Sequence, residues 1–403
     1  MGARGLCIAT LLGMVFLAGA SQGDKGLAEE APPTAADSIN HFGLDAYGVL
    51  RGGEGNLAFS PFSAYAALTV AHAGAQGETA RQIAEVLHVD ESSEDAPALF
   101  RAVADRLVPS GPKEAFGLRV ANGLWVQEGH PIRPVFLHVA RYRHRAQVES
   151  CDFAGDPGGA CRQINRWAEK QTRGRITDIV AEETLATNMS FVLANAVYFR
   201  GLWLKQFKEP TTEASFWVEP DRTVQVRMMK QHELFSYAEV DECKILAMAY
   251  KDLGAQMIVL LPKERGGLAD LEARLDVASL NTWCSLLETR SVDLSLPRFR
   301  AESGLELGRV LCSLGMDDAF EPSRADFSGI ITDCPLWVGR VAQKTFVAVD
   351  EKGTEAAAVT HVEVVYASAP PAVFRADHPF MFFIQDLRTG VILFMGRVAD
   401  PSQ

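Results

Sequence analysis

The sequence lacks any run of lysine and arginine, and its formal net charge is -12 at pH 7. Nucleic acids and anionic membranes attract proteins mainly through clustered positive charge. The charge balance therefore argues against both as the main partner of this chain.

The signatures of common enzyme sites are also missing. No Gly-x-Ser-x-Gly motif of a hydrolase occurs, and His232-Glu233 is not followed by the second histidine of a zinc-protease helix. The glycine-rich stretch Gly52–Gly55 follows a predicted helix rather than a strand, so it indicates a helix end and a turn rather than a phosphate loop. No histidine pairs with Cys, Asp or Glu at a metal-ligand spacing. We therefore expect a protein that is not an enzyme and that holds no metal and no cofactor.

Cysteine is scarce, with seven residues in 403. Cys7 lies in the N-terminal apolar run, and six cysteines follow it: Cys151, Cys161, Cys243, Cys284, Cys312 and Cys334. An even number in an exported protein permits disulfides, and Cys151 and Cys161 are the best-placed pair because they flank a loop rich in Gly and Pro. The alternative is that most of the six are buried thiols.

No apolar run is long enough to span a bilayer. Arg4 precedes a short apolar run from Leu6 to Leu17, and Ala18-Gly19-Ala20 fits a small-residue cleavage site. We therefore expect residues 1–20 to be a signal peptide and the protein to be secreted or periplasmic, without a membrane anchor.

Residues 21–37 are rich in Gly, Ala, Pro and acidic residues and predict a flexible lead-in to a single domain over residues 38–403. Apolar residues three and four apart predict helices early in that domain: Ser38–Leu50, Ser60–Ala73, Gly77–Leu87, Ala98–Val108 and Cys161–Thr172. Strand patterns dominate later, at Phe191–Phe199, Met257–Leu261, Ser291–Leu296, Phe380–Ile384 and Val391–Met395, with helices at Leu268–Leu275 and Gly304–Leu314 between them. Strands and helices do not alternate regularly, so we expect a mixed α+β domain with large sheets.

One segment near the C-terminus, residues 349–371, has only a weak preference for any secondary structure. Read with period two, it has one small or β-branched, uncharged face and one polar face, as in a strand with a single buried face. However, its alanine run has a low strand propensity, and Gly353 and the pair Pro370-Pro371 loosen both ends. From the pattern alone, an edge strand or an exposed alanine-rich helix is the simpler interpretation.

The first part of this segment resembles the hinge of the reactive-centre loop of inhibitory serpins: Glu351, Lys352, Gly353, Thr354, Glu355, Ala356, Ala357 and Ala358. Further stretches resemble other signatures of the family in the same order: Asn56–Ser63, Asn195–Trp203, Phe374–Phe382 and Phe394–Val398. The resemblance covers roughly residues 38–400. It implies an α+β serpin fold with three β-sheets, about nine helices and an exposed reactive-centre loop at about residues 351–373.

The resemblance also implies a suicide-substrate inhibitor of a serine protease. The protease attacks the loop and forms an acyl-enzyme, and the cleaved loop then inserts as a new strand of the main sheet. Counted from Glu351 as in the family, the reactive bond is Ala367–Ser368, which suits an elastase-like protease. A shift of one residue gives Tyr366–Ala367 and a chymotrypsin-like protease. Trypsin-like targets are disfavoured in either register because no Lys or Arg occurs between Gly353 and Phe374.

Residues elsewhere in the chain take supporting roles by the same resemblance. Four polar residues line the region where the sheet opens, namely Ser60, Ser63, Asn195 and Gln343. Trp203, Arg298 and Glu351 mark the region where the loop enters the sheet, and the two charged residues either form an ion pair, as in some members, or are solvated separately.

The expected partner is the target protease alone, and the protein is expected to be a monomer. The predicted helix Ala98–Val108 carries only Arg101 and Arg106 as basic residues, so we expect no heparin-type cofactor. The alternative is a non-inhibitory serpin that acts as a carrier, chaperone or passive protease substrate. The small residues of the hinge favour the inhibitor, because non-inhibitory members often carry bulky or charged residues there.

Overall fold

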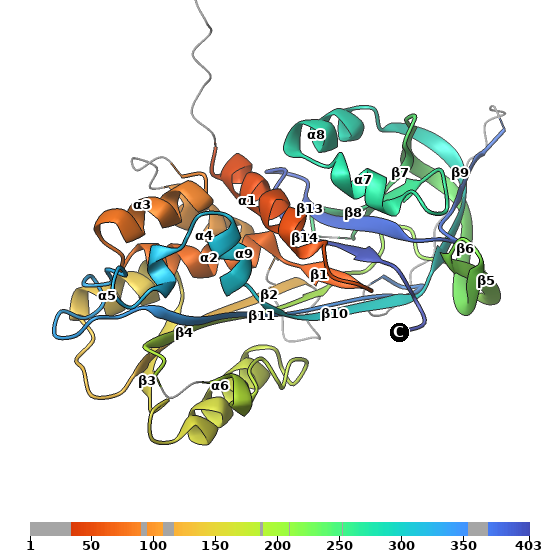
Figure 1. Ribbon diagram of the computed structural model, residues 1–403. Coiled ribbons are helices and arrows are strands. Elements are labelled where there is room, and N and C mark those ends of the chain that lie inside the picture. The colour runs from red at the N-terminus through yellow and green to blue at the C-terminus, as the bar shows by residue number, and fades with distance from the viewer. Residues whose placement is uncertain are drawn as a thin grey trace, which may run out of the picture. The chain divides into compact units, whose positions relative to one another are not determined.

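The computed structural model describes residues 34–89, 95–107, 117–185, 188–208, 210–251, 253–353 and 370–403. These residues form helices and two β-sheets, which confirms the mixed α+β architecture predicted from the sequence (Figure 1). The remaining residues include the predicted signal peptide and the greater part of the predicted loop, which lie outside the described residues.

Nine α-helices occur in the described residues, in agreement with the number that the resemblance implies. They are α1 (Ala35–Leu50), α2 (Pro61–His72), α3 (Gly77–Val86), α4 (Asp95–Leu107), α5 (Pro134–His138), α6 (Pro157–Gln171), α7 (Leu268–Ala273), α8 (Val277–Ser285) and α9 (Gly308–Ser313). Three shorter turns of helix are the π-helix η1 (Val139–Arg143) and the 3₁₀ turns η2 (Glu182–Thr184) and η3 (Asp318–Phe320). Helix α1 begins at Ala35, three residues earlier than its apolar period predicts, because Thr34 and Asp37 form a capping box.

The larger sheet has nine strands, and the described residues form two sheets where the resemblance implies three. Its strands are β1 (Leu57–Phe59), β5 (Thr212–Glu219), β6 (Arg222–Glu239), β7 (Cys243–Ala249), β8 (Ala255–Pro262), β9 (Glu288–Pro297), β12 (Ala372–Arg375), β13 (Phe380–Asp386) and β14 (Ile392–Val398). Strand β6 is 18 residues long and pairs with β9 along most of its length and with β7 at its C-terminal end. Strand β6 therefore connects two parts of this sheet, one with β9 and β12 and the other with β7, β8, β13 and β14.

The smaller sheet has five strands in the order β10-β11-β4-β2-β3. They are β2 (Gly117–Gln127), β3 (Gln147–Cys151), β4 (Phe191–Arg200), β10 (Phe299–Glu306) and β11 (Val338–Val349). Strands β4 and β11 are neighbours and run parallel, whereas β11 is antiparallel to β10 and β4 is antiparallel to β2. We call the line between β4 and β11 the seam.

Helices cover both faces of the five-stranded sheet (Figure 1). On one face lies α2, which is buried on every side and packs on β2 and β4. On the other face α6 forms a separate apolar cluster, in which Ile164 and Trp167 pack with Ala194 of β4 and Ala342 of β11. Because both faces are covered, β4 is apolar along almost its whole length rather than alternating.

The predicted helix Gly304–Leu314 is wrong in its first turn. Residues up to Glu306 belong to β10, and α9 begins only at Gly308. Side chains from Phe299 to Gly304 alternate between buried and exposed, and this period of two places the segment against β11. Pairing with β11 thus overrides the apolar spacing that suggested a helix.

The six cysteines in the described residues are free thiols, so the suggested pair Cys151–Cys161 is not bonded in this structure. Burial raises the pKa of Cys151 and of Cys243 to about 12, so both thiols are protonated at neutral pH. None of the helices within the described ranges is both long and apolar enough to cross a membrane.

Candidate functional site at the seam of the five-stranded sheet

Buried polar side chains join the seam to the start of α2. Gln343 of β11 lies opposite Asn195 of β4 in the parallel register, and its Nε2 donates to Asn195 Oδ1 at 2.8 Å. The same amide donates to the carbonyl of Ser60 at 3.0 Å and accepts from the Ser60 N–H at 3.0 Å. Both hydrogen-bonding groups of Gln343 are therefore used beneath the seam.

Asn195 extends this network across β4. Its Nδ2 donates to Asn122 Oδ1 of β2 at 2.6 Å and to the carbonyl of Ser63 at 3.3 Å, and it also contacts Ser63 Oγ. The structure thus brings together all four residues that the sequence assigned to sheet opening.

Two members of the network were missed from the sequence. Asn122 occupies an otherwise apolar part of β2, and Thr345 donates to Gln343 Oε1 at 3.1 Å. A buried asparagine in an apolar strand needs a partner, so Asn122 was detectable in principle.

The six side chains of this network are all neutral and nearly inaccessible to solvent, with exposures of 5% or less. A buried amide or hydroxyl that loses its partner costs about 1–3 kcal/mol. Separating β4 from β11 would break the hydrogen bond between Gln343 and Asn195, so the network opposes separation of the two strands.

Trp203 follows β4 and lies at the end of the seam where β11 also ends. The side chain is buried, stacks on Tyr250 with ring centroids 4.6 Å apart, and donates from Nε1 to the carbonyl of Asp350 at 3.0 Å. Its backbone N–H donates to the carbonyl of Lys352 at 3.0 Å. Trp203 therefore fixes the segment that follows β11, a partner that the sequence did not reveal.

This segment is a tight turn from Asp350 to Gly353. The N–H of Asp350 donates to the carbonyl of Gly353 at 2.8 Å, and the N–H of Lys352 donates to Asp350 Oδ1 at 2.9 Å. Gly353 has a φ of 135°, and a Cβ atom there would lie 2.2 Å from the carbonyl oxygen of Gly201. Only glycine fits this position without displacing the backbone.

Glu351 and Arg298 form an ion pair beside the turn, which answers the alternative left open by the sequence. Arg298 Nε donates to Glu351 Oε1 at 2.7 Å, and Thr211 Oγ1 also donates to that oxygen. Burial raises the pKa of Glu351, but the bonds from Arg298 and Thr211 outweigh it and leave the pKa below the usual carboxyl value.

The rest of the predicted loop lies outside the described residues. This includes Thr354, Glu355, Ala356, Ala357 and Ala358 of the hinge and the candidate bonds at Tyr366, Ala367 and Ser368. The chain is described again from Pro370, and β12 then pairs in parallel with β9 in the nine-stranded sheet. Residues 354–369 thus connect the end of β11 to a strand of the other sheet.

No metal site accompanies the seam in the described part of the chain. His, Cys, Asp and Glu side chains form no cluster of three or more there that could hold a metal ion. On α4, Arg106 is paired with the buried carboxylate of Asp386 and is therefore not a free surface charge.

Comparisons with known proteins agree on one family. Residues 37–401 match the family model described as serpin (serine protease inhibitor). An uncharacterized serpin-like protein of Thermococcus kodakarensis is 39% identical over 93% of this chain and 88% of its own length. Leukocyte elastase inhibitor A of Rattus norvegicus is 35% identical over 86% of this chain and 93% of its own length.

A solved structure shows the same fold. Serpin48 of the insect Tenebrio molitor, described as a highly specific serpin, superposes with a TM-score of 0.79 at 33% identity, covering 93% of this chain and all of that one. Both the predicted fold class and the predicted family are therefore confirmed, and the chain belongs to the serpin family.

Proposed function

We propose that this serpin is an exported, monomeric suicide-substrate inhibitor of a serine protease with elastase-like or chymotrypsin-like specificity. The observation that carries the proposal is the parallel seam between β4 and β11, which is closed by a neutral network and ends at the turn Asp350–Gly353. The similarity to a leukocyte elastase inhibitor supports the elastase-like alternative.

The topology favours insertion at this seam. The chain leaves β11 through a tight turn, so a strand formed directly after the turn runs back antiparallel to β11. Because β4 is parallel to β11, the same strand is antiparallel to β4 as well. Insertion therefore replaces one parallel pair by two antiparallel pairs, which are slightly more stable per residue.

The energy for the trap comes from the new strand. Residues Thr354 to Ala367 span roughly 45 Å when extended and form on the order of ten backbone hydrogen bonds, each worth about 1 kcal/mol net. The small residues after Gly353 enter first and have little bulk to accommodate. The uncleaved state is then kinetically trapped rather than the most stable state.

In the reaction, the serine Oγ of the protease attacks the carbonyl carbon of Ala367 or Tyr366. The peptide bond breaks, and the new amine of the following residue leaves with a proton, so an acyl-enzyme ester remains. Insertion of the loop then moves the tethered protease before water attacks the ester.

Incubation with pancreatic elastase and with chymotrypsin tests the proposal. We expect a complex that survives SDS with at least one of them, and mass spectrometry of the released peptide identifies the bond as Ala367–Ser368 or Tyr366–Ala367. Cleavage by both enzymes without any complex contradicts inhibition and favours a passive substrate.

The substitution Thr354→Arg tests the insertion step. Insertion would bury the new charge without a partner, so we expect the variant to be cleaved as a substrate with at least a tenfold lower yield of complex. Thr354→Ser is the matched control and should retain the wild-type yield. An Arg variant that forms complexes as well as the wild type disproves insertion at this position.

A further inference from the structure

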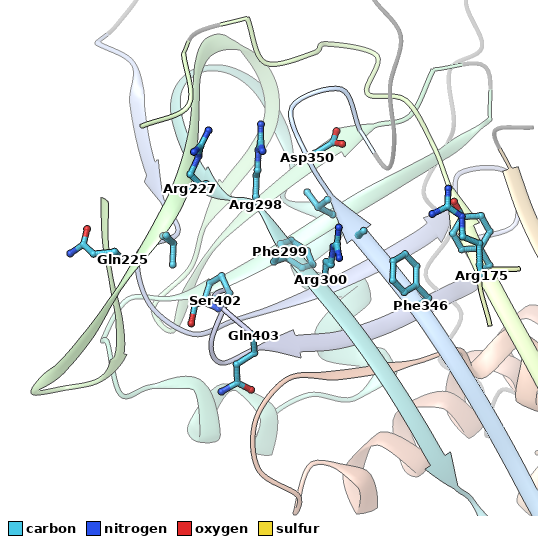
Figure 2. Close-up of a pocket in the computed structure, with 15 residues that line it drawn as sticks. Arg175, Gln225, Arg227, Arg298, Phe299, Arg300, Phe346, Asp350, Ser402 and Gln403 are labelled. Atoms are coloured by element: carbon cyan, nitrogen blue, oxygen red, sulfur yellow. The ribbon is translucent and has the colours of Figure 1, made fainter. Parts of the chain in front are cut away.

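A cleft of about 690 Å³ opens at the end of the seam that carries the hinge (Figure 2). Its volume lies within the range of small-molecule sites in proteins. Tyr198 of β4 and Phe346 of β11 both line the cleft, lie opposite each other in the register of the seam, and have ring centroids 5.9 Å apart. The cleft therefore spans the seam rather than lying to one side of it.

Four arginines line this cleft, although the chain as a whole carries a net charge of -12. Arg175 follows α6, Arg227 lies on β6, Arg298 lies between β9 and β10, and Arg300 lies on β10. Figure 2 shows the side chains of Arg227 and Arg298 side by side and pointing the same way. The N–H of Arg298 donates to the carbonyl of Arg227 at 2.8 Å, which fixes these two like charges as neighbours.

The positive charge of the cleft is only partly balanced by acidic side chains in the described residues. Asp350 is the one carboxylate side chain in the lining, and its Oδ1 already accepts from the N–H of Lys352. Arg298 pairs with Glu351, whereas the side chains of Arg227 and Arg300 form no ion pair within the described ranges. Neighbouring guanidinium groups repel each other, and a bound anion relieves that repulsion.

We propose that this cleft binds a small organic anion that carries two or more carboxylate, phosphate or sulfate groups on a flat apolar body. The guanidinium groups of Arg227, Arg298 and Arg300 bind the anionic groups, since their planar forks match these groups in geometry. The rings of Phe346 and Tyr198 contact the apolar body. The aromatic pair favours a flat ligand over inorganic phosphate.

Such a ligand also stabilises the closed seam, an effect that we call bracing. It contacts Tyr198 on the β4 side and Phe346 and Arg300 on the β11 and β10 side, so opening the sheet pulls these contacts apart. Binding to the closed sheet alone stabilises it by mass action. The consequence for protease inhibition rests on the proposed function: slower insertion leaves the acyl-enzyme more time to hydrolyse.

Isothermal titration of the uncleaved protein with benzene-1,3,5-tricarboxylate tests binding. We expect one site per chain, affinity that weakens with added NaCl, and at least tenfold weaker binding in the double variant Arg227→Gln, Arg300→Gln. Arg388→Gln removes an exposed arginine outside the cleft and should bind as the wild type does. Equal affinity in the double variant and the wild type overturns the assignment of the site.

Hydrogen exchange with and without the tricarboxylate tests the bracing independently of any protease. We expect amides of β4 and β11 to exchange at least threefold more slowly with ligand in the wild type and without change in the double variant. A ligand that binds while leaving exchange at the seam unchanged overturns the bracing. An assay with elastase and with chymotrypsin, run in parallel, separates the two proposals, because an absence of SDS-stable complex with both enzymes in the absence of ligand contradicts the proposed function alone.

Discussion

Gly353 lies in the turn after β11 and within the predicted hinge, which begins at Glu351. The substitution Gly353→Ala adds a Cβ 2.2 Å from the carbonyl oxygen of Gly201 in a positive-φ conformation, so we expect a loss of about 2–5 kcal/mol of stability. Thermal unfolding followed by circular dichroism measures it as a lower Tm.

Gly174→Ala is the control for the backbone conformation alone. Gly174 also has a positive φ, of 76°, but a Cβ there meets nothing within 4 Å, so we expect only about 1–2 kcal/mol. Equal losses in the two variants would mean that the close approach of the turn to Gly201 contributes nothing.

Glu351 should make the stability of the folded protein depend on pH. Its pKa in the folded protein lies below the usual value of 4.5, so its bonds to Arg298 and Thr211 stabilise the fold above about pH 4.5. That contribution is lost as the pH falls through the lowered pKa, because the protonated carboxyl no longer pairs with Arg298.

The variant Glu351→Gln should therefore differ from the wild type at neutral pH and converge with it in acid. Because the pair is partly exposed, we expect at most about 1 kcal/mol at pH 7. Tm values measured from pH 7 down to pH 3 test this, and a difference that stays constant over the range would rule out the ion pair as its cause.

At the scale of elements, the seam between β4 and β11 depends on Asn195. Asn195→Ala removes the partner of Gln343 and of Asn122 within a buried network, so we expect a loss of about 1–3 kcal/mol and a faster change to an inactive form. The measurements are Tm and the half-life of inhibitory activity at 37 °C.

Asn281→Ala on α8 is the control for Asn195→Ala, because Asn281 is exposed and alanine is a better helix former. It should leave both the Tm and the half-life unchanged or slightly increased. Equal effects of the two substitutions would show that the network does not hold the seam.

Strands buried on both faces were predictable from the sequence, whereas strands whose bounds depend on pairing with another strand were not. The apolar run Phe191–Phe199 corresponds to β4, and the run Met257–Leu261 lies within β8, because full burial requires apolar residues throughout. The end of strand β10 was predicted as helix, because its apolar spacing continues into α9, whereas its pairing with β11 joins segments that are distant along the chain.

At the scale of the whole molecule, cleavage should make this serpin more stable. Insertion of residues 354–367 adds on the order of ten backbone hydrogen bonds, or about 10 kcal/mol, so we expect the Tm to rise by more than about 10 °C. Differential scanning calorimetry before and after limited elastase cleavage measures this.

The variant Thr354→Arg should lose most of the rise in Tm after cleavage, because its charge resists burial. A cleaved wild type with an unchanged Tm would show that the loop stays outside the sheet. Together with an absence of SDS-stable complexes, that outcome would favour a non-inhibitory serpin.

The sequence by itself determined the family, the α+β class and four of the six polar residues at the seam, because local motifs and apolar periods carry this information. Only the tertiary structure decided that Ser60, Gln343 and Asn195 form one network, and that Trp203 binds the turn after β11. Only the tertiary structure shows that four arginines line one cleft. These contacts join residues up to 283 positions apart along the chain, and packing of the sheet on α2 and of β10 on β11 brings them together.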